Sequence, residues 1–62
     1  MDDNLLLLTP KAAAQRLSLA ESTLYQLLTS GELESITIGR ARRIPMEALT
    51  DYIARLREEQ RT

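Results

Sequence analysis

The chain has 62 residues, a formal net charge of −1, and neither cysteine nor histidine. A chain of this length forms one domain with a small core, because it buries only about 60% of its extended surface on folding. Disulfides, thiolate zinc sites and imidazole chemistry are excluded, so we expect no metal and no cofactor. The longest aliphatic run, Leu5–Leu8, is too short for a membrane span or an export signal, and we expect a cytoplasmic protein with no membrane partner.

Positive charge is concentrated in one segment, although the total charge is slightly negative. Arg40, Arg42 and Arg43 lie between residues 37 and 46 with no acidic residue among them. The net charge argues mildly against nucleic-acid binding, whereas this local concentration of arginine argues for it.

The first predicted helix begins at Thr9-Pro10, with Thr9 as its N-cap and Pro10 at the first helical position. The run Leu5–Leu8 before it either packs across the core as an extended segment or leads directly into the helix. An apolar stripe at helical spacing continues the pattern through Pro10, Ala13, Ala14 and Leu17.

A second helix is predicted from residue 21 to Ser30, after a turn of three residues in which Leu19 is expected to point inward. Ala20 stands where a Ser or Asp cap is expected, which weakens the start of the helix by about 1 kcal/mol. Gly31 ends the helix as a left-handed C′ residue. One face of the helix is apolar and consists of Ala20, Leu24, Leu27 and Leu28.

The opposite face of this helix is polar but uncharged, with Ser22, Tyr25, Gln26 and Thr29 at positions i, i+3, i+4 and i+7. Hydroxyl and amide groups donate and accept hydrogen bonds in fixed directions, as reading the edges of bases requires. A helix, a short turn and a second helix free to enter a groove form the helix-turn-helix arrangement. The pattern favours a DNA recognition helix, and the alternative is a mildly polar surface helix.

A β-hairpin is predicted next, with strands at residues 35–38 and 42–44 around a turn at residues 39–41. Two strands this short do not stand alone, so we expect the hairpin to pack on the helices. The side chains expected to make this contact are Leu33, Ile36, Ile38 and Ile44.

A last helix is predicted to open at Pro45. Its expected inner stripe consists of Leu49, Tyr52, Ile53 and Leu56. We expect residues 1–4 and the segment after Leu56 to fray, which leaves an ordered core of about residues 5–57 in one domain, 1–62. The charged face of this helix, with Arg55, Arg57 and Arg61 among acidic residues, is either solvated or a contact surface for a neighbouring copy or an integrase.

The order of these elements resembles the MerR-like winged helix-turn-helix domains of phage and transposon excisionases, or recombination directionality factors. The resemblance covers about residues 8–56. It rests on Leu8-Thr9-Pro10-Lys11-Ala12-Ala13, Ser22-Thr23-Leu24-Tyr25-Gln26-Leu27-Leu28, Gly31-Glu32-Leu33, Ile38-Gly39-Arg40-Ala41-Arg42-Arg43-Ile44-Pro45, and Leu49 with Tyr52-Ile53. It implies a mainly α fold of three helices plus a small two-stranded β-hairpin, the wing.

The same resemblance implies that the second helix enters the major groove while the wing contacts the DNA backbone or the minor groove. For excisionases it further implies a small non-catalytic protein that binds repeated sites in an attachment region, bends the DNA and promotes excision by an integrase. The expected partners are double-stranded DNA, a cognate integrase and further copies of the chain on adjacent sites, in a bacterial host cell.

Two positions depart from the family pattern. Family members often carry Arg or Lys where this chain has Glu21, so the second helix lacks a phosphate clamp at its start. Glu21 either accepts a hydrogen bond from a cytosine amino group or is merely tolerated. The aromatic residue often found at the position of Arg42 is also replaced, which puts the packing of the wing in doubt and raises its charge.

Four residues of the second helix besides Glu21 are candidate DNA contacts. Ser22, Thr23 and Gln26 are expected to reach bases or phosphates, and Gln26 is able to pair bidentately with adenine. Tyr25 either hydrogen-bonds a phosphate or is a core aromatic that has turned outward.

The remaining candidates are cationic. Arg40 at the tip of the wing and Arg43, which alternation turns outward, are expected to reach a phosphate or a narrow minor groove. Alternation puts Arg42 on the side of Ile44, so its stem is expected to lie against the edge of the core. Lys11 either touches a phosphate beside the helix N-terminus or is an ordinary surface residue.

No catalytic residue is predicted. Without His or Cys, an enzyme needs a carboxylate pair or a Ser–Lys arrangement in a concave pocket, and the acidic residues here fall on helix exteriors. We therefore expect neither catalysis nor a small-molecule substrate. The alternatives to an excisionase are a small transcriptional regulator with the same domain and a protein-interaction module that does not bind DNA.

Overall fold

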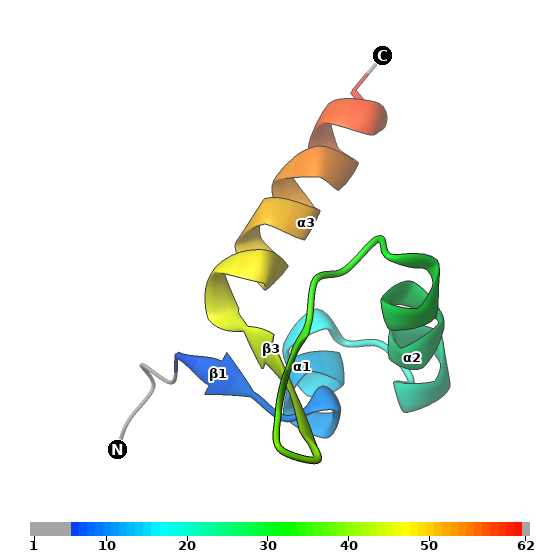
Figure 1. Ribbon diagram of the computed structural model, residues 1–62. Helices are drawn as coiled ribbons and strands as arrows, with labels where there is room; N and C mark the ends of the chain where they lie inside the picture. The colour runs from blue at the N-terminus through cyan, green and yellow to red at the C-terminus, as the bar shows by residue number, and fades with distance from the viewer. Residues whose placement is uncertain (1–5, 62) are drawn as a thin grey trace.

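The computed structural model describes residues 6–61, which form three helices and three short strands (Figure 1). The elements in chain order are β1 (Leu7–Leu8), α1 (Pro10–Leu17), α2 (Glu21–Ser30), β2 (Ile36–Ile38), β3 (Ala41–Pro45) and α3 (Met46–Glu59). The predicted fold class, mainly α with a hairpin wing, is confirmed. The predicted N-terminal tail, Leu5 and Thr62 lie outside the described residues.

The hairpin is joined by a third strand at its base. The sheet order is β1-β3-β2, and β1 pairs antiparallel with β3 through Leu7 opposite Pro45 and Leu8 opposite Ile44. The Met46 amide also donates a hydrogen bond to the Leu6 carbonyl over 2.9 Å. The sequence left open whether the residues before α1 are extended across the core or lead directly into the helix, and this pairing confirms the extended alternative for residues 7–8. The two-stranded hairpin predicted from the sequence therefore has a third, edge strand.

The turn between α1 and α2 depends on a left-handed residue that the sequence did not reveal. As predicted, Thr9 caps α1, because its hydroxyl oxygen accepts a hydrogen bond from the Ala12 amide over 3.1 Å. At the other end Ser18 has a φ of 58°, and the following Leu19 amide donates to the Ala14 carbonyl over 2.9 Å. This pattern is a Schellman-type C-cap, which normally uses glycine. Leu19 itself is half-buried.

Helix α2 has the ends predicted for it. Ala20 is its N-cap and makes no side-chain hydrogen bond to the helix. Gly31 ends it with a φ of 85° and donates its amide to the Leu28 carbonyl over 3.3 Å. The start of the helix is therefore held less firmly than its end.

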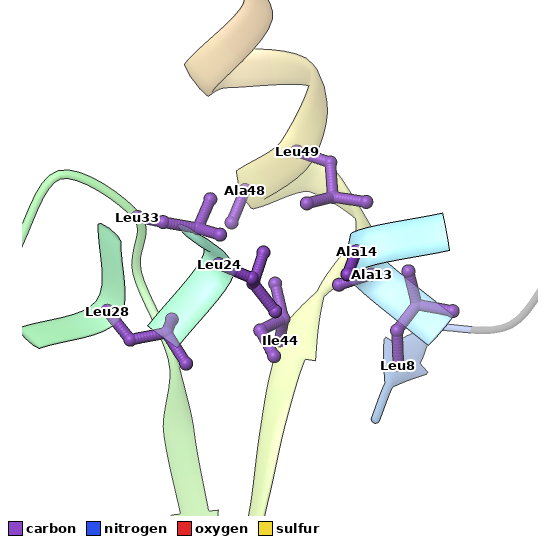
Figure 2. Close-up of a cluster of buried hydrophobic side chains, with 9 residues drawn as sticks. All are labelled: Leu8, Ala13, Ala14, Leu24, Leu28, Leu33, Ile44, Ala48 and Leu49. Carbon is purple, nitrogen blue, oxygen red and sulfur yellow. The ribbon is translucent and has the colours of Figure 1, made fainter. Parts of the chain in front are cut away.

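One apolar core joins α1, α2, β3 and the first turn of α3 (Figure 2). Ala13 and Ala14 are small and buried, so Leu24 of α2 and Ile44 of β3 approach α1 closely, and both are 0% exposed. The buried set is Leu8, Ala13, Ala14, Leu24, Leu28, Leu33, Ile44, Ala48 and Leu49. This core fixes α2 against α1 and sets the base of the wing.

Two of the four side chains predicted to hold the hairpin on the core do not do so. Ile36 is 37% exposed and Ile38 is 56% exposed, whereas Leu33 and Ile44 are buried. The register explains the error, because Ile36 lies opposite Arg43 and Ile38 opposite Ala41. Paired residues point to the same face of a sheet, so both isoleucines lie on the face opposite to that of Ile44. A hairpin that buries Ile44 must expose them.

Helix α3 buries less and extends further than predicted. Ala48 and Leu49 are buried, Tyr52 and Leu56 are half-buried, and Ile53 is 40% exposed, so its place in the predicted inner stripe is wrong. Figure 1 shows that the C-terminal part of α3 extends away from the other elements, which leaves that part without a core to pack on. The helix nevertheless continues to Glu59, so the fraying predicted beyond Leu56 is also wrong at residues 57–59. Arg and Glu are good helix formers even where nothing packs on them.

Candidate nucleic-acid interface

The exposed face of α2 carries the uncharged polar side chains predicted for it. Ser22, Tyr25, Gln26 and Thr29 are all exposed, and Tyr25 is 45% exposed. Together with Ser30 they line one shallow depression of about 430 Å³, which we call the α2 depression. The helix thus presents a continuous surface to solvent. Tyr25 points outward, which both of its predicted alternatives allow.

Two residues of the α2 depression were absent from the predicted contacts. Thr29 follows Ser22 at i+7, so the helical spacing already placed it on this face. Ser30 has a structural role, because its hydroxyl donates to the Leu27 carbonyl over 3.1 Å and accepts from the Glu32 amide over 3.3 Å. Thr23, by contrast, was predicted as a contact, but it is half-buried and does not line the depression.

Glu21 lies exposed in the first turn of α2. The N-terminus of a helix carries a partial positive charge and favours an acidic side chain by about 0.3–1 kcal/mol. Because Ala20 provides no side-chain cap, a carboxylate at this position supports a helix start that is otherwise weak. Glu21 therefore has a role in folding, independent of any contact with a base.

The wing turns at Gly39-Arg40. Ile38 pairs with Ala41, so the loop has two residues, one fewer than predicted, and Gly39 has a φ of 63°. Glycine at positive φ in the first loop position is typical of the type II′ turn, whose twist suits a hairpin. Arg40, the second residue of the loop, is exposed at the tip as predicted.

Arg42 and Arg43 lie on the predicted faces of the wing, but Arg42 is more exposed and Arg43 more buried than predicted. Arg42 shares a sheet face with Ile44 but pairs with Thr37, nearer the tip and beyond the core, so it is exposed rather than packed on the core edge. Its Nε donates to the Ser35 hydroxyl over 3.1 Å. Arg43 is half-buried on the opposite face and donates to the Arg42 carbonyl over 2.9 Å.

The charge of the wing arginines (Arg40, Arg42 and Arg43) is not neutralised within the described residues. Among residues 6–61 the ion pair found is Arg61 with Glu58, at 3.1 Å on α3, and none involves the wing. Lys11 is exposed in the first turn of α1, which contains no acidic residue. The wing and the start of α1 thus offer cations able to bind phosphate.

A metal site requires clustered ligands, and a membrane span requires a long apolar helix. In the part of the chain that the structure describes, no three Asp, Glu, His or Cys side chains come together in a way that could hold a metal ion. Within the same residues, no helix has the length and apolar character needed to cross a membrane.

Comparison with known proteins gives two matches. A family profile described as "Helix-turn-helix domain" matches residues 7–57. A protein of Saccharopolyspora erythraea named "Probable excisionase" is 51% identical to the chain over 57 residues, which cover 92% of this chain and 58% of that protein. The chain thus spans less than two thirds of the length of that relative. No solved structure matches the chain.

Proposed function

The chain belongs to the helix-turn-helix domain family, and from that membership we propose that it is a non-catalytic DNA-binding protein that acts as an excisionase. One observation carries the proposal: the same small fold combines an uncharged polar recognition surface with a cationic wing. The α2 depression lies on the second helix of the helix-turn-helix, and among residues 6–61 the three wing arginines form no ion pair with an acidic residue. The likeness to a protein named "Probable excisionase" supports the choice of excisionase within the wider class of DNA-binding proteins.

In the proposed mechanism, α2 enters the major groove and supplies contacts to the bases. Arg40 and Arg42, which are exposed, contact phosphates on the flank or in the minor groove, and Lys11 contacts a phosphate beside the start of α1. Phosphate contacts of this kind fix the position of a protein on DNA, and base contacts specify the sequence. Arg43 is half-buried, so its main task is to support the wing.

One copy should bind DNA weakly, because it offers few cations and its net charge is −1. Stable occupancy then requires several copies on adjacent sites, or an integrase already on the DNA, since linked binding events raise the effective affinity. Several bound copies bend the attachment region and favour excision. The protein acts in the cytoplasm of the bacterial host.

The test is a recombination reaction with a candidate cognate integrase, on DNA substrates for excision and for integration. Addition of the protein should raise excision and lower integration. An integrase whose excision and integration rates do not change would overturn the excisionase assignment. If the protein nevertheless binds attachment-site DNA, the result favours the transcriptional regulator. If it does not bind DNA even at low salt, the result favours the protein-interaction module.

A further inference from the structure

Helix α2 contains no lysine or arginine between Glu21 and Ser30. In the major groove, the commonest sequence-specific contact is an Arg or Lys side chain that donates to O6 and N7 of guanine. This contact is not available to α2. The long amide side chain on its exposed face is Gln26, whose amide matches the N6 donor and N7 acceptor of adenine.

The α2 depression is lined mainly by carbon. The half-exposed ring of Tyr25 and the methyl group of Thr29 lie one helical turn apart on the same face. The hydroxyl of Ser30 is already bonded to the Leu27 carbonyl and the Glu32 amide. Among the bases, only thymine presents a methyl group in the major groove, and apolar side chains are its usual partners.

We propose that α2 specifies A·T base pairs: Gln26 pairs with adenine, and the α2 depression receives the methyl group of a nearby thymine. This inference rests on the proposed function and narrows its substrate from DNA to sites whose contacted core consists of A·T pairs. Glu21 does not line the depression and takes no part in this recognition.

The experiment begins with selection of binding sites from a duplex library with a randomised centre. The selected duplex is then resynthesised with each thymine replaced in turn by uracil, which differs only in lacking the methyl group. The core should consist of A·T pairs, and uracil at the contacted thymine should weaken binding about fourfold, as expected for one methyl group. Uracil in the flanks should have no effect and serves as the control.

Two variants test the roles of the named side chains. Gln26→Ala should reduce the preference for adenine over the other bases by about five- to 150-fold at one position. Tyr25→Ala should abolish the difference between thymine and uracil. The quantity to compare is the ratio of the affinities for the thymine and the uracil duplex. A general loss of affinity or of folding lowers both affinities equally and leaves this ratio unchanged, so a change in the ratio isolates the role of the Tyr25 ring.

The outcomes separate this inference from the proposed function. A selected core fixed by G·C pairs, or a site where uracil is silent at every thymine, would overturn the A·T inference and leave DNA binding intact. Failure to enrich any sequence, with no retention of duplex DNA at low salt, would overturn both.

Discussion

The guanidinium of Arg55 donates a hydrogen bond to the carbonyl of Glu32 over 2.6 Å, and this bond ties α3 to the segment that follows α2. The same guanidinium lies 5.8 Å from the ring centre of Tyr52. Because α3 buries only Ala48 and Leu49, this bond is one of the few contacts that set its position. The sequence predicted that Arg55 lies on a face that is either solvated or a contact surface for a neighbouring copy or an integrase, whereas the structure gives it a hydrogen-bond partner within the chain.

Arg55→Ala should lower the free energy of unfolding by about 1 kcal/mol, the usual net value of one hydrogen bond. The measurement is urea unfolding followed by circular dichroism. Arg57→Ala is the matched control, since Arg57 is exposed on the same helix and no side-chain bond of its own is found in residues 6–61. Equal stability of the two variants would mean that the Arg55 bond contributes nothing.

Ser18→Gly should stabilise the turn between the helices by up to about 1 kcal/mol. Ser18 occupies the left-handed region, which strains a residue with a Cβ, and part of the gain is offset by the greater freedom of glycine in the unfolded chain. For a domain of this size the melting temperature should rise by up to about 4–8 °C. Ser18→Ala keeps the strain and should show no increase; an equal increase would contradict this account of the turn.

Glu21→Gln should weaken folding and strengthen DNA binding at once. The loss of a favourable charge at the start of α2 should cost about 0.3–1 kcal/mol, while removal of an anion from the proposed interface should raise affinity at low salt. Glu47→Gln provides the comparison, because Glu47 lies in the first turn of α3. The Glu47→Gln variant should lose a similar amount of stability, and its affinity for DNA should not increase. Reduced affinity of Glu21→Gln would instead support a contact from Glu21 to cytosine.

Ile44→Ala and Ile38→Ala test which face of the hairpin meets the core. Ile44 is 0% exposed, and its truncation should cost about 2–5 kcal/mol in the free energy of unfolding. Ile38 is 56% exposed and should cost less than about 0.5 kcal/mol. Losses of similar size, measured by urea unfolding, would mean that the strands pair in another register.

Local signals in the sequence predicted most of the fold. The cap at Thr9, the stop at Gly31 and the apolar spacing of Leu24 and Leu28 are properties of neighbouring residues, and the structure confirms all of them. The strand β1 was harder to predict, because two residues carry no periodicity and their pairing with β3 joins distant parts of the chain.

For the candidate site too, the sequence predicted what depends on neighbouring residues better than what depends on distant parts of the chain. Helical spacing placed Ser22, Tyr25 and Gln26 on one exposed face, and the structure confirms that arrangement. Alternation also placed Arg42 on the face of Ile44 and Arg43 on the opposite face, but the exposure of each depends on the hairpin register and on where the core ends. Local spacing therefore predicted which face each of these side chains occupies, but not how far Arg42 and Arg43 are exposed.

The most direct test of the central claim, that the wing anchors α2 on DNA, is the salt dependence of DNA binding by the Arg40→Ala variant. Affinity for attachment-site DNA, measured by fluorescence anisotropy over a series of salt concentrations, should be lower than that of the unmodified chain. The slope of log affinity against log salt should fall by about one, as expected for one lost phosphate contact. Arg57→Ala should leave the slope unchanged, because it lies on the part of α3 that points away from the hairpin tip (Figure 1). Equal slopes for all three proteins would contradict the proposed interface.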